Sequence, residues 1–353
     1  MPNYRNINVR SPFFTQKATT GSVVNCEIRL WKGDVVTDLP VDYTYLLSKE
    51  PTSGKSTFEV AELARDFLSH TTSLSSGFAW MELKLKDTIV ADDTFTFLVS
   101  EGYSINTEGL QSTNDTPIYD FVGLPTTTIN GVANSSRIMV ADGNTNSIPY
   151  FSNSDGAIYT VTDYFSDELI AGLATIPLET NSSQMVKSYL ITPSISSAYF
   201  DFDGNGRNVV VDVLRCSKFD VVNLLYVNKA GFKTKFPFIL KSTEKISVDS
   251  ESFSRSTVDY GALTLNTNSH SSRKRIKDTK QSFVLNSDWI AEYYVSQFEE
   301  LMLSEYVWLE KGSLTLPVNI TTSKLDKKTH LNDKLINYSI EIETASNYIN
   351  TIR

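Results

Sequence analysis

The feature that most constrains the fold of this chain is a strict alternation of apolar and polar residues near its C-terminus. Apolar side chains occupy every second position, namely Ile336, Tyr338, Ile340 and Ile342. The residues between and after them are polar, namely Asn337, Ser339, Glu341 and Glu343. Because successive side chains of a strand point to opposite faces, this alternation predicts an antiparallel strand with one buried face and one solvated face.

The residues before this strand predict a helix and a hairpin. An apolar segment at 283–285 is followed by Asn286-Ser287-Asp288, a sequence typical of a helix N-cap. Apolar residues then recur at helical spacing, namely Ile290, Tyr294, Phe298 and Leu301. Beyond them the period changes to two, and segments 306–309 and 314–320 flank a turn, which indicates a hairpin. Residues 281–343 are therefore expected to form a unit in the order strand, helix, hairpin, strand.

Length and composition predict a mainly β protein with more than one domain. The chain has 353 residues, and a domain usually takes roughly 100–200. It is rich in Ser, Thr, Asn and aromatic residues, which favours strands joined by polar turns. We expect two β-sandwich-like regions, 1–104 and 105–245, followed by a C-terminal α+β assembly domain, 246–353.

The first region is predicted to contain strands and one short helix. Cys26, Ile28 and Leu30 alternate with polar residues, as in a strand. Ser56 and Glu59 have the spacing of a capping box. An apolar stripe at helical spacing follows, namely Val60, Leu63, Ala64, Phe67 and Leu68. In the second region, a polar stretch at 104–154 predicts an extended loop or weak strands, and short turn-separated strands are expected after it.

One polar cluster in the second region is a candidate calcium loop. Asp201, Asp203 and Asn205 would supply positions one, three and five, Gly206 position six, and Asp212 position twelve. The flanking residues predict strands, however, whereas a calcium loop of this kind lies between helices. A tight hairpin is the alternative, because Asp-Gly and Asn-Gly supply the positive φ that such turns require. Calcium is the only cofactor that the sequence suggests.

Charge and apolar patterning limit the partners of the chain. The net charge of −9 argues against a general nucleic-acid binder, which needs a basic footprint. The basic cluster at 273–277 is interpreted as a solvated connector, with contact to nucleic acid or an acidic surface as the alternative. No apolar run approaches the ~20 residues of a membrane helix and no signal-peptide pattern is present, so we expect a soluble chain made in the cytoplasm.

Cys26 and Cys216 lie in apolar segments and are expected to be buried thiols.

No arrangement of residues in the sequence indicates an enzyme. The histidines are His70, His270 and His330, and none accompanies a nucleophile motif. Their settings favour surface or capping roles. The segment Gly54-Lys55-Ser56-Thr57 lacks the earlier glycine of a phosphate-binding loop, since Lys49 stands at that position. The chain is therefore expected to be non-enzymatic.

Several segments resemble structural proteins of tailed bacteriophages, in particular phages of Bacteroidota and related aquatic bacteria. The segments that carry the resemblance are NVRSPFF at 8–14, RLW at 29–31, LYVNKAG at 225–231, KISV at 245–248, SFSR at 252–255, LSEYVWL at 303–309, LPVNI at 316–320 and NDKLINY at 332–338. They touch both ends and much of the second half, whereas residues 105–200 are hardly covered.

The resemblance implies a virion component of the tail, baseplate or tail-tip region, and it carries over no catalytic residues. The expected function is that of an oligomeric adaptor whose partners are other copies of itself and other virion proteins. Exposed edges and the hairpin of 281–343 are the expected subunit contacts. The alternative is a virion protein that binds a host receptor or surface glycan, with the loop-rich region 105–155 as its contact surface.

Overall fold

The computed structural model describes most of the chain. The described residues are 5–19, 21–33, 38–74, 76–112, 121–122, 127–129, 132–151, 159–163, 169–171, 186–191, 197–202, 207–214, 218–259, 261–265, 267–268, 270–326 and 335–348. The fold is mainly β, as the sequence predicts, with several sheets and a short C-terminal helix followed by strands. Among the described residues, no helix has the length and apolar character needed to cross a bilayer.

The N-terminal unit is built from a larger and a smaller sheet. The larger has the order β1 (Arg5–Asn8), β7 (Asp93–Ser100), β6 (Phe78–Lys86), β3 (Val24–Trp31) and β4 (Tyr45–Lys49). The smaller has the order β5 (Lys55–Glu59), β2 (Phe13–Ala18) and β8 (Gln111–Ser112), and a short 3-10 helix, η1 (Asn106–Glu108), precedes β8. Phe13 of the smaller sheet packs edge to face against Phe97 of the larger sheet, with ring centroids 5.2 Å apart, so the two sheets share one core. Cys26 lies in that core, where burial raises the pKa of its thiol to about 12.

The predicted helix of this unit begins later than the sequence indicates. Ser56 lies in β5, where its backbone is paired with Lys17 and its hydroxyl donates to the Lys49 carbonyl. The helix α1 (Ala61–Arg65) begins after Glu59, whose carboxylate accepts the Ala61 N–H at 2.9 Å. The capping-box prediction was therefore wrong, because pairing with β2 supplies the backbone partners that a cap would otherwise provide. The apolar stripe that follows does pack into the core.

The middle unit contains two further sheets. One has the order β10 (Thr127–Ile129), β11 (Val132–Ala141), β17 (Arg207–Leu214), β16 (Ser197–Phe202), β13 (Tyr159–Asp163) and β14 (Leu169–Ala171). The other has the order β15 (Val186–Ile191), β12 (Asn146–Phe151) and β9 (Phe121–Val122). Asn146 joins this unit to the C-terminal sheet, because its side-chain amide donates to the carbonyls of Met139 and Lys235 at 2.8 and 3.0 Å.

The C-terminal unit is one antiparallel sheet of seven strands. Its order is β19 (Lys233–Phe238), β18 (Val222–Val227), β24 (Val307–Lys311), β25 (Leu314–Ile320), β26 (Leu335–Thr344), β23 (Ser272–Ala291) and β20 (Thr243–Ser254). β18 and β19 precede residue 246, so the expected boundary between 245 and 246 does not coincide with the edge of this sheet. The boundary differs because β18 pairs with β24, a strand about 80 residues later in the chain.

A helix covers one face of this sheet, and the core lies between them. The helix α2 (Val295–Leu303) follows a short 3-10 turn, η2 (Glu292–Tyr294), and buries Phe298 against Phe236 and Tyr338 with ring centroids 5.6 and 5.0 Å apart. Burying an aromatic side chain of this size contributes roughly 2–3 kcal/mol. The predicted alternation in the last strand is confirmed, because its four apolar side chains are all buried in this core.

The predicted start of the C-terminal helix was wrong. Residues 286–288 form a β-bulge between β23 and β26, and Asp288 has φ +70°. The Ser287 hydroxyl accepts the Tyr338 N–H at 3.0 Å and donates to the Asp288 carbonyl at 2.9 Å. Pairing with β26 resumes beyond the bulge up to Ala291, so the sheet, rather than a helix, takes the backbone hydrogen bonds of this segment.

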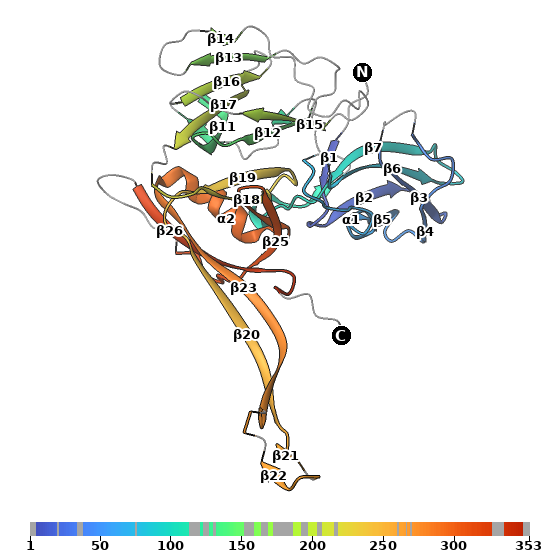
Figure 1. The fold of residues 1–353 in the computed structure, drawn as a ribbon. Coiled ribbons are helices and arrows are strands. Elements are labelled where there is room, and N and C mark those ends of the chain that lie inside the picture. The colour runs from blue at the N-terminus through green and yellow to red at the C-terminus, as the bar shows by residue number, and fades with distance from the viewer. Residues whose placement is uncertain are drawn as a thin grey trace.

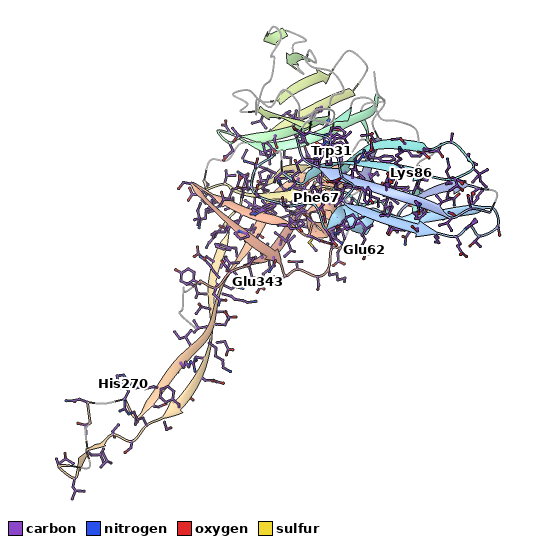
Figure 2. The ribbon with its side chains drawn as sticks, turned by 90° about the vertical axis from the view of Figure 1, so that its right-hand side faces the viewer. Trp31, Glu62, Phe67, Lys86, His270 and Glu343 are labelled. Atoms are coloured by element: carbon purple, nitrogen blue, oxygen red, sulfur yellow. The ribbon has the colours of Figure 1, made fainter. Side chains whose placement is uncertain are left out.

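β20 and β23 continue beyond the sheet as a two-stranded ribbon that projects from the body of the molecule (Figure 1). We call residues 245–280 the arm. A short pair of strands, β21 (Val258–Asp259) and β22 (Thr264–Leu265), forms its distal end. The arm points away from the N-terminal unit in both views of the molecule (Figures 1 and 2).

Candidate functional site

The structure does not bring the candidate calcium ligands together as one set. Asp203 and Asn205 lie outside the described residues. The backbone of Asp201 lies in β16 opposite Asn208, and Asp212 lies in β17 opposite Ser197. Asp212 is thus four positions from Asn208, roughly 13 Å along the strand, which is too far for Asp201 and Asp212 to share one ion. The antiparallel pairing of β16 with β17 agrees with the hairpin alternative.

Asp212 instead helps to join the middle unit to the C-terminal unit. Its carboxylate accepts hydrogen bonds from the hydroxyls of Tyr293 and Tyr294, and lies 3.2 Å from the Arg137 guanidinium. That guanidinium also lies over the Tyr293 ring at 4.4 Å. Burial and the nearby Asp212 carboxylate raise the pKa of Tyr294 well above its ordinary value, so this hydroxyl remains a donor. The cluster is a structural joint, which sequence spacing could not reveal because its members come from three elements.

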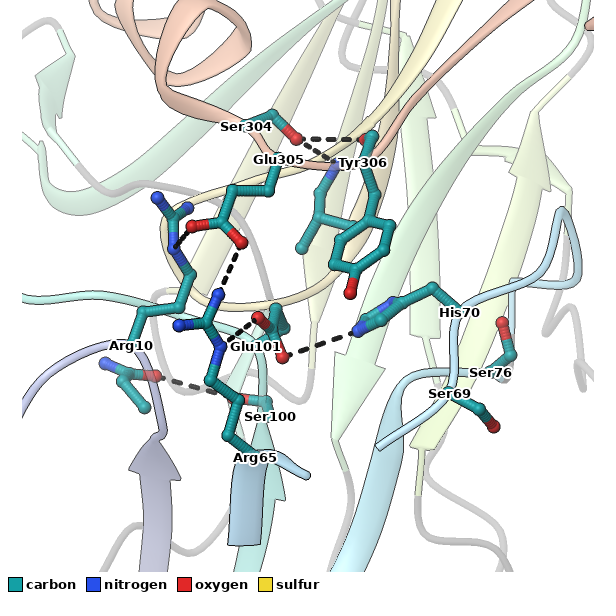
Figure 3. A network of polar contacts seen from close by, with 12 residues as sticks. Arg10, Arg65, Ser69, His70, Ser76, Ser100, Glu101, Ser304, Glu305 and Tyr306 are labelled. Carbon is teal, nitrogen blue, oxygen red and sulfur yellow. Dashed lines mark hydrogen bonds and ion pairs between the residues drawn. The ribbon is translucent and has the colours of Figure 1, made fainter. Parts of the chain in front are cut away.

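A second polar network joins the N-terminal unit to the C-terminal sheet (Figure 3). The Glu101 carboxylate, 2% exposed, accepts from the Arg65 guanidinium at 3.0 Å. The other end of that guanidinium contacts Glu305, which also pairs with Arg10 at 3.3 Å. Arg10 donates in addition to the Leu303 carbonyl at 3.0 Å. The two arginines belong to the N-terminal unit, and Glu305 lies between α2 and β24, so the network crosses the boundary between units.

His70 lies in the same network, rather than in the surface or capping role that its sequence setting favours. Its ring stacks on Tyr306 with centroids 4.2 Å apart, and its Nε2 lies 3.6 Å from the Glu101 carboxylate. Its side chain is almost fully buried. Burial raises the pKa of Glu101, but the neighbouring His70 and Arg65 outweigh this effect, and the net pKa is lowered. Glu101 is therefore ionised, and its charge holds Arg65 at the junction.

Close backbone packing completes this junction. Gly231, in the turn between β18 and β19, has φ +85°, and a Cβ placed there would lie 2.6 Å from the Ser100 Cβ. Ser100 donates to the Ala230 carbonyl at 3.0 Å, and Tyr103 donates its backbone N–H to the Lys229 carbonyl at 2.9 Å. The junction therefore needs a residue without a side chain at position 231.

Two further described residues, Glu300 and His270, have side chains of the kinds that catalysis uses. Glu300 on α2 is buried and accepts the Lys229 N–H at 3.3 Å, and burial raises its pKa to about 7. His270 lies in the distal part of the arm (Figure 2), and His330 lies outside the described residues. Within the ranges that the structure describes, no group of three or more His, Cys, Asp or Glu side chains is placed to hold a metal ion. Cys216 also falls outside those ranges.

The arm is amphipathic, which sequence reasoning missed. Directly paired residues of antiparallel strands share a face, and Ile276 is paired with Ser250, which lies on the same side of β20 as Ile246 and Val248. These three apolar residues therefore form a row on one side of the ribbon. Ile246 and Val248 are each 52% exposed. The other side carries charged residues, namely Lys245, Asp249, Glu251, Arg273, Arg275, Asp278 and Lys280. The alternation from 244 to 248 is the sequence signal that could have identified this strand.

The arm also carries basic side chains with exposed charges. Arg255, Arg273, Lys274 and Arg275 are exposed, and none forms an ion pair within the described part of the chain. Lys277, by contrast, pairs with Glu251 across the ribbon. Near the distal end, Leu263 and Leu265 are 84% and 69% exposed. Phe253, which is 50% exposed, is paired with Arg273 and so lies on the charged side of the ribbon. That side therefore combines an apolar side chain with basic ones, and such a surface can bind an apolar surface of opposite charge.

Comparisons with family models and with curated proteins found no match for this chain. Among solved structures, immunoglobulin domains 1–4 of Sidekick-1 align over 81% of this chain and 67% of that one, at 10% identity and a TM-score of 0.16. A structure on host cell surface retention of a 1.5-MDa bacterial ice-binding adhesin aligns over 81% of this chain and 88% of that one, at 8% identity and a TM-score of 0.15. TM-scores this low do not indicate a shared fold.

Proposed function

We propose that this chain is a non-enzymatic structural subunit of a tailed-bacteriophage virion, acting as an oligomeric adaptor in the tail or baseplate region. The resemblance of segments at both ends of the sequence to phage structural proteins supports the virion context. The mainly β architecture and the junctions between its units are compatible with a load-bearing subunit.

The observation that carries the proposal is the projecting arm. A ribbon of two strands is only marginally stable in water by itself, and each residue of β20 is exposed. An exposed edge strand is a template for pairing with another chain, and natural monomers usually shorten or cover such edges. A subunit that buries the arm against a neighbour removes both disadvantages. The arm is thus better suited to an assembled protein than to an isolated one.

Electron microscopy of phage particles labelled with an antibody against this chain tests the proposal. The expected result is label in symmetric positions on the tail or baseplate. Label confined to a distal fibre tip or to the head surface would support the receptor- or glycan-binding alternative. Particles without label would contradict a virion role, and turnover of host surface glycan by the purified chain would contradict the non-enzymatic part.

A further inference from the structure

The N-terminal unit carries a surface that complements the arm. β4 is the last strand of its sheet, so one backbone edge of this strand has no strand partner among the described residues. We call residues 41–50 the β4 edge. Val41, Tyr43 and Leu46 are exposed there, Val41 to 88%. Leu46 lies in the strand, and Val41 and Tyr43 lie in the segment directly before it. An open strand edge beside exposed apolar side chains is a typical docking surface.

The charge of the β4 edge is opposite to that of the arm. Asp42 and Glu50 are exposed, and neither forms an ion pair within the described part of the chain. The one basic residue of this edge, Lys49, donates its ammonium group to the Thr57 carbonyl at 2.9 Å. The arm has seven basic and four acidic residues and therefore a net charge of +3. Since the whole chain has a net charge of −9, the rest of the chain carries −12. Both surfaces therefore hold exposed charges that have no partner of opposite sign among the residues that the structure describes.

We propose that the arm of one copy docks against the β4 edge of a second copy. The occupant is another copy because the arm of the same chain points away from its own N-terminal unit (Figures 1 and 2). The contact joins two different surfaces, so it is heterologous, and repeated contacts of this kind form a closed ring or an open filament. This inference rests on the proposed function in that it names the partner that an oligomeric subunit would use.

Paired charge reversals in the full-length chain test the contact. One variant carries Arg273→Glu and Arg275→Glu in the arm, and the other carries Asp42→Lys and Glu50→Lys in the β4 edge. Each variant alone places like charges on both surfaces, whereas a mixture offers opposite charges in both combinations. A matched control exchanges the signs of an exposed ion pair, by Lys324→Glu and Asp326→Lys. Sedimentation velocity from about 1 to 100 μM protein measures self-association, and circular dichroism checks that each variant is folded.

The expected result has three parts. The parent chain and the control self-associate, each reversed variant alone associates at least about tenfold more weakly, and an equimolar mixture regains association. Association of the parent also weakens with added salt, because exposed charges are screened.

Other results would overturn the contact. The contact is wrong if the parent stays monomeric, if the reversed variants associate like the parent, or if the mixture does not regain association. Arm-dependent binding of a labelled DNA duplex, with self-association unaffected by the arm reversal, would assign the basic side chains to nucleic acid instead. The microscopy above is independent of these results. Labelled particles with a monomeric parent would contradict this contact alone, and self-association with unlabelled particles would contradict the virion role alone.

Discussion

Glu101 is the residue through which the N-terminal unit is held to the C-terminal sheet. Its carboxylate is buried, contacts Arg65 directly and faces the His70 ring. Through Arg65 it is coupled to Glu305, on the other side of the junction. A buried carboxylate is favourable only while its charged partners remain in place, so its removal weakens both sides of the junction.

We expect Glu101→Gln to lower the free energy of unfolding by about 2 kcal/mol at pH 7, because a charge-assisted hydrogen bond is lost in a buried setting. The folded-state pKa of Glu101 is lowered from 4.5, so its contribution is present above that pH and is lost as the pH falls through the folded-state pKa. Urea denaturation at several pH values should show the difference shrinking below about pH 4.5. The control Glu62→Gln, at an exposed position of α1, should stay within about 0.5 kcal/mol of the parent. A loss of stability that is equal at pH 7 and pH 3 would contradict this role.

Glu300 has the opposite pH dependence, because burial raises its pKa from 4.5 to about 7. The folded state then binds a proton more tightly than the unfolded state, so this residue favours folding below pH 4.5 and loses that effect as the pH rises through about 7. We expect Glu300→Gln to be more stable than the parent at pH 8 by roughly 1–3 kcal/mol, and to show little difference at pH 4.5. Its amide oxygen can still accept the Lys229 N–H.

Thermal or urea unfolding of the parent and the Glu300→Gln variant across this pH range measures the effect. The control Glu292→Gln removes a charge from the adjacent 3-10 turn, where the residue is only partly buried, and should show no comparable gain. A Glu300→Gln variant that is less stable than the parent at pH 8 would mean that the ionised carboxylate is stabilising.

At the scale of elements, the turn between β18 and β19 sets how closely the two units approach. We expect Gly231→Ala to lower the free energy of unfolding by roughly 2–4 kcal/mol, because it combines an unfavourable positive φ with a clash against Ser100. Gly312, in the turn between β24 and β25, is a matched control with φ +62° and open space around it. Gly312→Ala should cost only about 1 kcal/mol. Equal costs in urea denaturation would show that the close approach at Gly231 is unimportant.

The sequence predicted elements well where their pattern is local and poorly where the partner is distant. The alternation around Ile340 and the hairpin at Gly312 are visible within ten residues, and both are confirmed. Ser56 and Asn286-Ser287-Asp288 have the local chemistry of helix caps, yet strand partners from elsewhere take their hydrogen bonds. The basic cluster at 273–277 belongs to β23 and is not the connector that the sequence predicts, because β20 pairs with β23 across an intervening polar segment.

At the scale of the whole molecule, sheets assembled from distant segments limited prediction from sequence. The C-terminal sheet combines residues 222–238 with residues after 243, so a boundary drawn from local composition falls inside it. The junction around Glu101 was missed for the same reason, because its residues are separated by up to about 300 positions in the chain. Of the candidate calcium ligands, Asp201 and Asp212 are separated by the register of β16 and β17, which agrees with the hairpin alternative suggested by the Asp-Gly and Asn-Gly pairs.

The measurement that most directly tests whether the arm mediates assembly is the mass in solution of the species formed by the full chain and by a chain without its arm. Asp249 and Asp278 are paired across the ribbon, so residues 250–277 can be replaced by Asn-Gly, which closes a two-residue hairpin. We expect the shortened chain to keep the thermal stability of the body and to remain monomeric at concentrations where the full chain self-associates. A folded, shortened chain that still forms the same assemblies as the full chain would contradict the account.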